Sequence, residues 1–140
     1  MKQFALSVLA LLVVSLSLFA QEVGADNEQK KETIEFDTTV YDYGEIDYAS
    51  DGVCVFTFTN TGNEPIVISS VRASCGCTVP SWTKDPIKPK EKGEVKMKYN
   101  TYIPGAFNKS ITVLSNGNPS RVILRAKGLV KKNEQQHTIR

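Results

Sequence analysis

Two cysteines separated by one glycine, Cys75 and Cys77, lie in the segment SVRASCGCTVPSW at residues 70–82. Thiolates at this spacing support several kinds of chemistry. The pair can hold a soft ion such as Cu(I), whereas zinc needs about four ligands and hence a second copy of the chain. The pair can also be a redox-active disulfide, an inert disulfide or two packed side chains. The spacing alone leaves these alternatives open.

Backbone geometry limits how Cys75 and Cys77 can be bridged. In a fully extended strand, residues two apart have Cα atoms close to the limit of about 7 Å for a disulfide. Gly76 can adopt a positive φ, so we expect it to fold the segment into a tight turn that brings the sulfurs together. A bridge closing so small a loop removes little chain entropy, and strained, exposed bridges are the more easily reduced ones.

Outside this segment, the residues needed for catalysis are not grouped. The single histidine, His137, lies in a polar C-terminal stretch, and no Ser-His-Asp or Cys-His set can be built around it. The sequence has no glycine-rich phosphate loop and no H-E-x-x-H motif. We therefore predict a non-enzymatic protein without a cofactor.

Three aromatic residues, Tyr41, Tyr43 and Trp82, are candidates for a recognition surface. They would contact a protein partner or stack against a sugar. The alternative is that they are half-buried strand residues whose polar ends reach water. The third cysteine, Cys54, shares a strand face with Phe56 and Phe58, which predicts a buried free thiol.

The chain begins with the features of a secretory signal peptide. A charged start is followed by the apolar run 4–19 and by Ala20, and this run is shorter than a membrane-spanning helix requires. We predict a signal peptide at 1–20, a flexible polar leader at 21–33, one domain at 34–130 and a polar tail at 131–140. The mature chain would be periplasmic or secreted, with no transmembrane segment, in a compartment where disulfides persist.

Charge argues against one class of partner. The formal net charge is only +2, and the basic residues form no continuous stripe along the sequence. Nucleic-acid-binding domains usually carry such a stripe. We therefore expect no nucleic-acid partner, and a protein of the cell envelope is the expected partner.

Alternation of apolar and polar residues predicts the fold. In GEVKMKYN, for example, Val95, Met97 and Tyr99 share one face. Period two with one apolar face indicates strands that cover a core on one side. Clusters of Gly, Pro, Asn and Asp separate the strands at the spacing typical of sandwiches. The predicted strands are 33–37, 39–46, 52–60, 65–73, 93–100, 107–115 and 120–130, with a shorter one at 78–82. The predicted fold is an all-β, immunoglobulin-like antiparallel sandwich of about seven strands.

Five segments in this order resemble a secreted bacterial family, domain of unknown function family 1573. They are YDYGEI, FTFTNTGNEPIVISSVRASCGCTVPSW, IKPKEKGEVKMKYNT, GAFNKSITVLSNG and LRAKGLV, and they cover about residues 34–130. The S-C-G-C-T motif at Ser74–Thr78 is the most specific. The resemblance implies a sandwich of the Hydin and major sperm protein group and a bacterial envelope setting, but no reaction. The family usually has a glycine where this chain has Lys90, so that turn is expected to differ.

These observations lead to two functional hypotheses. The first is an exported, non-enzymatic module that binds another envelope protein or packs into an assembly, with a free strand edge as the docking place. The alternative is a thiol-based protein that works through Cys75 and Cys77 in redox exchange or copper handling.

Overall fold

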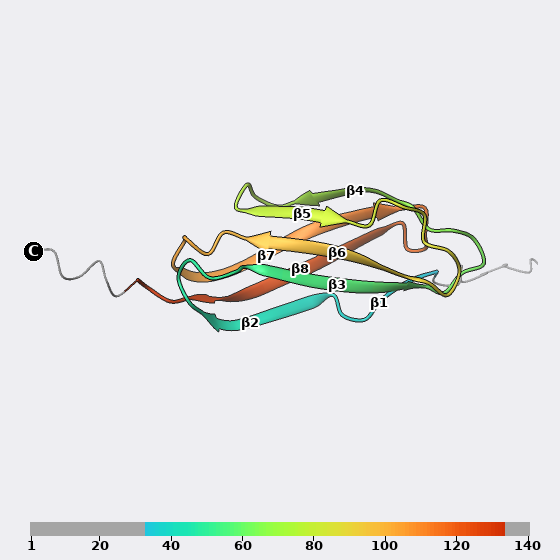
Figure 1. The fold of residues 1–140 in the computed structure, drawn as a ribbon. Helices are drawn as coiled ribbons and strands as arrows, with labels where there is room; N and C mark the ends of the chain where they lie inside the picture. Colours follow the sequence, from blue (N-terminus) through green and yellow to red (C-terminus); the bar gives the residue numbers. More distant parts are fainter. Residues whose placement is uncertain (1–32, 134–140) are drawn as a thin grey trace, which may run out of the picture.

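The computed structural model describes residues 33–133, which form two β-sheets packed face to face (Figure 1). The predicted signal peptide at 1–20, the leader up to residue 32 and the tail from residue 134 lie outside the described residues. Within 33–133, no helix is long and apolar enough to cross a membrane. The predicted all-β sandwich is confirmed, with eight strands that include the short one expected at 78–82.

Sheet A contains four antiparallel strands in the order β1-β3-β6-β5. Its strands are β1 (Ile34–Phe36), β3 (Val53–Asn60), β6 (Lys92–Tyr99) and β5 (Thr78–Trp82). The edge strands are β1, which has only three residues, and β5, which contains Pro80. A proline in an edge strand removes one donor that another chain could pair with.

Sheet B has the order β2-β8-β7-β4. Its strands are β2 (Val40–Ile46), β8 (Arg121–Val130), β7 (Gly105–Ser115) and β4 (Ile68–Ala73). One pairing differs from the expected antiparallel arrangement, because β2 runs parallel to β8. The chain crosses from sheet A to sheet B through residues 37–39 without reversing, so β2 keeps the direction of β1 (Figure 1).

The core lies between the two sheets and follows the alternation of the strands. In β6 every second residue is buried, and in β3 the side chains of Cys54, Phe56 and Phe58 point inward. The largest fully buried apolar side chains are Phe56, Phe58, Met97, Ile111, Leu124, Val95, Val113 and Val130. Burial of each such side chain contributes about 1.5–3 kcal/mol.

The strand β4 begins later than the turn signals indicated. Residue 65 was the expected start, but Ile66 forms only an isolated bridge with Ile87, and the strand begins at Ile68. The side chain of Asn116 accounts for the difference. It accepts a hydrogen bond from the Val67 N–H and donates one to the Pro65 carbonyl, so these backbone groups are paired outside the sheet.

Candidate functional site

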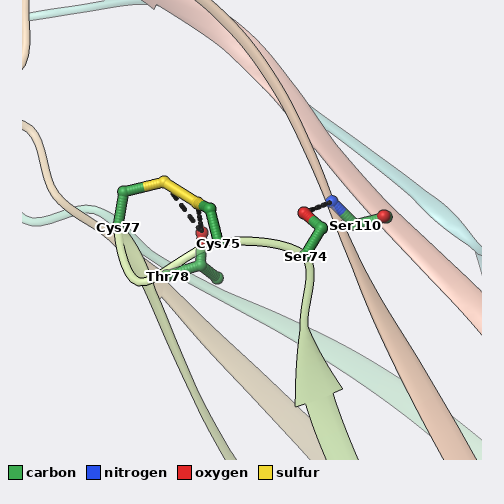
Figure 2. Close-up of a disulfide and its surroundings, with 5 residues drawn as sticks. All are labelled: Ser74, Cys75, Cys77, Thr78 and Ser110. Atoms are coloured by element: carbon green, nitrogen blue, oxygen red, sulfur yellow. Dashed lines mark hydrogen bonds between the residues drawn. A yellow bond between two sulfur atoms is a disulfide. The ribbon is translucent and has the colours of Figure 1, made fainter.

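The two cysteines of the S-C-G-C-T motif lie in the connection between β4 and β5, at one end of the sandwich (Figures 1 and 2). This connection carries the chain from the edge of sheet B to the edge of sheet A. Ser74 anchors its first residue to β7. Its N–H donates to the Ser110 carbonyl at 2.9 Å, and its hydroxyl accepts from the Ser110 N–H at 3.3 Å. The loop is therefore held at a fixed place beside β7.

Cys75 and Cys77 form a disulfide, with their Cα atoms 5.4 Å apart (Figure 2). The expected mechanism of this turn is wrong, because Gly76 does not adopt a positive φ. The bend and turn of residues 74–77 bring the Cα atoms within bridging distance without a left-handed residue. Both cysteines are half-buried, and Gly76 between them is exposed. The bridge is thus accessible from one side.

Thr78 lies directly beneath the disulfide and was not singled out by sequence reasoning. Its side chain is buried, and its Oγ1 lies 3.9 Å from the sulfur of Cys75 and 3.9 Å from that of Cys77 (Figure 2). In a reduced pair this hydroxyl is placed to donate to either thiolate. The signal that could have identified it was its place in the S-C-G-C-T motif.

Packing beneath the loop joins the disulfide to the end of the sandwich. Cys77 packs against a small cluster in which Tyr99 and Phe107 stack with ring centroids 3.9 Å apart. The Asn100 N–H donates to the Cys77 carbonyl at 2.9 Å. The loop therefore rests on buried aromatic rings from both sheets.

Cys54 is separate from this site. It is a free, buried cysteine of the main core cluster, as expected. Burial raises the pKa of its thiol, while hydrogen bonds with Tyr43 and the Met97 backbone oppose this effect. A buried neutral thiol is inert.

The three candidate aromatic residues do not form one surface. Tyr41 and Tyr43 lie on β2, and Trp82 lies on β5, at the opposite edge of the sandwich. Tyr43 is half-buried and donates its hydroxyl to the Gly52 carbonyl at 2.6 Å. The Nζ of Lys84 lies 3.0 Å from the ring centroid of Trp82 and covers one face of the indole. Tyr41 remains the exposed member of the three.

No metal centre is assembled in the part of the chain from 33 to 133. This part contains no group of three or more His, Cys, Asp and Glu side chains that could hold an ion. His137 lies outside the described residues. Two thiolates from Cys75 and Cys77 become available only when the disulfide is reduced.

The fold and this loop define the class of the protein, a small β-sandwich with a disulfide-closed connection between its two sheets. The family model for the protein of unknown function family DUF1573 matches residues 34–130. The chain belongs to this family, and the resemblance carried by the five sequence segments is confirmed. No curated protein matches the chain.

Solved structures share the fold at low sequence identity. A protein of unknown function from Porphyromonas gingivalis W83 is 15% identical with a TM-score of 0.63, covering 70% of this chain and 46% of its own. This chain thus spans less than half the length of that protein.

Two further structures widen the comparison. PapD-like domain 7 of human CEP192 is 8% identical with a TM-score of 0.61, covering 74% of this chain and 88% of its own. The VesB protease of Vibrio cholerae is 12% identical with a TM-score of 0.56, and the match covers 71% of this chain and 32% of the protease chain. The PapD-like match confirms the immunoglobulin-like class of the sandwich, and at these identities the likeness concerns the fold alone.

Proposed function

We propose that this protein is a non-enzymatic binding module of the bacterial envelope, exported to the periplasm or beyond, that holds another protein. The observation that carries the proposal is the free edge of β4. Among the four edge strands, β1 has three residues, β5 contains Pro80, and the pairing of β2 is interrupted by a register shift between Asp42 and Glu45. Short strands, prolines and bulges protect sheet edges from other chains. Among the edge strands of residues 33–133, β4 combines six residues with no proline and no positive φ. Its pairing with β7 also shifts register, between Ile68 and Ser70, so the regular part of this edge is residues 70–73.

The backbone of β4 has pairing groups to offer at this edge. The Ser74 N–H points toward β7, because it donates to the Ser110 carbonyl. Backbone groups alternate in direction along a strand, so those of Val71 and Ala73 point away from β7. Within residues 33–133, no backbone hydrogen bond outside the strand ladders engages these groups. An extended segment of a partner can add to such an edge as a further strand.

In-cell photo-cross-linking tests this function. A photoreactive residue at Ser69, an exposed residue of β4, should trap a defined partner in the envelope. The same residue at Lys88, which is exposed in the loop between β5 and β6, is the control and should trap much less of it. The same set of weak products from both positions would show that β4 holds no specific protein.

A second candidate function is thiol–disulfide exchange at Cys75 and Cys77, supported by the position of Thr78 beneath both sulfurs. A partner thiolate would attack one sulfur, form a mixed disulfide and release the other cysteine as a thiolate. A second partner thiolate would then attack the mixed disulfide. The partner dithiol is oxidised to a disulfide, and Cys75 and Cys77 are reduced by two electrons. Copper handling would require this reduced state.

The variant Cys77→Ser tests this second function, because the remaining Cys75 would hold a mixed disulfide that no neighbouring thiol resolves. We expect a trapped partner with Cys77→Ser and none with the double variant Cys75→Ser, Cys77→Ser. The double variant should lose only about 1.6 kcal/mol of stability, because the bridge closes a loop of three residues. Recovery of the same amount of trapped partner with both variants would exclude the exchange reaction.

A further inference from the structure

The outer face of sheet B carries a group of arginines from strands that are distant in the sequence. Arg72 lies on β4, and Arg121 and Arg125 lie on β8. The register pairs Arg72 with Thr112, Arg121 with Leu114, and Arg125 with Ser110, all through the central strand β7. Inward-facing Ile111 and Val113 alternate with these β7 residues, so the three arginines share the solvent face.

The acidic side chains nearest to these arginines on the same face, Asp42 and Glu45, lie on β2, where they pair with Lys127 and Leu129 of β8. None of the ion pairs found in residues 33–133 involves an arginine. Asp42 on the adjoining β2 is already engaged, with its carboxylate 3.3 Å from Lys127 Nζ and accepting the Gly44 N–H at 2.8 Å. The Gly44 hydrogen bond, followed by Lys127, lowers the pKa of this carboxyl below its ordinary value. Arg72, Arg121 and Arg125 thus have no ion pair of their own, and the charge of Asp42 is shared with Lys127.

A shallow hollow of about 370 Å³ lies between two of the arginines. It is lined by Arg72, Ala73, Ser74, Ser110, Thr112, Leu114 and Arg121. Arg72 and Arg121 lie on strands either side of β7 and pair with Thr112 and Leu114, which places their backbones about 12 Å apart. The hydroxyls of Ser110 and Thr112, which line the hollow beside Arg72, make no side-chain hydrogen bond within residues 33–133. Two guanidinium groups around free hydroxyls form a suitable site for a planar anion.

We propose that the outer face of sheet B binds an acidic segment of a protein partner, with a carboxylate held between Arg72 and Arg121. This inference rests on the proposed protein-binding function and specifies the class of partner. The hollow adjoins the free edge of β4, because Arg72 belongs to that strand. A segment that contacts the edge can thus place its acidic side chains over the face.

The composition of the face favours a protein over a nucleic acid or an anionic lipid. Leu114 and Ile123 are exposed among the arginines, at 36% and 44% of their surface. Arginine mixed with apolar side chains is typical of protein interfaces. Single-stranded nucleic acids are usually bound by aromatic side chains on which bases stack. The outward-facing residues of β4, β7 and β8 include no aromatic side chain.

The test is a titration of the mature chain, followed by amide chemical shifts, with a 12-residue peptide of repeated Asp-Leu-Glu-Ser. We expect shifts at Arg72, Ser110, Thr112 and Arg121, and weaker binding at higher salt. The variant Arg72→Glu, Arg121→Glu should bind at least ten-fold more weakly. The control variant Lys88→Glu, Lys98→Glu carries the same charge change on exposed residues outside sheet B and should bind like the wild type.

Three results would overturn the inference. They are no binding of the peptide, equal loss of binding in both double variants, or tighter binding of tripolyphosphate or anionic phospholipid vesicles at the same residues. If the charge reversal disturbs folding, the neutral variant Arg72→Gln, Arg121→Gln replaces it in the titration. We expect this variant to lose binding of the peptide as well. A partner cross-linked at Ser69 that is retained by the charge-reversed variant would overturn this inference and leave the binding function standing. Absence of any partner at Ser69 would instead count against the binding function itself.

Discussion

Asn60 is a buried polar side chain that organises the end of the sandwich opposite the disulfide. It is fully buried, and its Nδ2 donates to the Glu64 carbonyl at 2.7 Å and to the Ile87 carbonyl at 2.8 Å. Its Oδ1 accepts from the Gly62 N–H at 2.9 Å. One side chain thus joins the loop after β3 to the loop before β6.

Substitution of this residue should be costly. Asn60→Ala removes three hydrogen bonds and takes the Asn60 partner from the Gly62 N–H and the Glu64 carbonyl, while the Ile87 carbonyl keeps its bond from the Ile66 N–H, so we expect the free energy of unfolding to fall by about 2–3 kcal/mol. Urea unfolding measures this change. Asn63→Ala, at an exposed position in the same loop, is the control and should stay within about 0.5 kcal/mol of the wild type. Equal effects of the two substitutions would show that the buried hydrogen bonds contribute little.

Tyr43 makes the stability of the domain sensitive to alkaline pH. Burial, and then a hydrogen bond with the Cys54 thiol, raises the pKa of its phenol above the ordinary value of 10.0. The folded state therefore keeps the proton after the unfolded state has lost it. The stability that this phenol contributes is complete below about pH 10 and is lost as the pH rises above that value.

Tyr43→Phe tests this pH dependence. Between pH 9 and 11 the wild type should lose stability more steeply than the variant. The difference should be below about 1.4 kcal/mol per pH unit, because the phenol is partly exposed. Urea midpoints at several pH values give both slopes. The slope of Tyr102→Phe, at an exposed tyrosine, should match that of the wild type. If the wild type and Tyr43→Phe lost stability equally steeply with pH, the alkaline sensitivity would not come from the Tyr43 phenol.

Among the structural elements, the turn before β6 contains a lysine with a left-handed backbone. Lys90 has a φ of 68°, in the left-handed region that glycine occupies most easily. A lysine therefore holds a backbone conformation that favours glycine at this position. The Lys90 N–H donates to the Asn60 carbonyl at 2.8 Å, which ties the turn to the core.

The substitution Lys90→Gly should therefore stabilise the protein. It removes the cost of a side chain in a left-handed conformation and keeps the backbone hydrogen bond, for an expected gain of about 0.5–1 kcal/mol. Lys88→Gly, in the same loop and without a positive φ, should instead lose about 0.5–1 kcal/mol. Thermal unfolding of the two variants shows whether each one is more or less stable than the wild type. A loss of stability in both variants would contradict the account of this turn.

For the whole molecule, the last strand closes the fold. Among the strands of residues 33–133, β8 pairs with β7 on one side and is the only one that pairs with β2. Its inward side chains Leu124, Ala126 and Val130 are buried in both clusters of the core. The sandwich thus depends on a strand that begins only at residue 121.

Two truncations test this dependence. A chain ending after Ser120 loses β8 and should show no cooperative unfolding transition, because β2 has no partner and the core is open. A chain ending after Asn133 keeps every described strand and should unfold within about 0.5 kcal/mol of the full chain. Circular dichroism during urea unfolding shows whether each of the two truncated chains unfolds cooperatively. A cooperative transition in the shorter chain would show that β8 is dispensable.

Local pattern was sufficient to predict the strands and the class of fold. The alternation around Val95, Met97 and Tyr99 is a property of neighbouring residues, so it is visible without knowledge of strand partners. The buried free thiol of Cys54 followed from the same alternation. The candidate loop at Cys75 and Cys77 was also recognised from sequence, because the two cysteines are separated by a single residue.

Only the tertiary structure decided which residues meet. The parallel pairing of β2 with β8 depends on how the chain crosses between the two sheets. Arg72 and Arg121 are 49 residues apart in sequence and share one hollow through the register of β7. The sequence alone therefore determined which residues alternate inward. Strand pairing, which is set by contacts distant along the chain, determined which of them form a site.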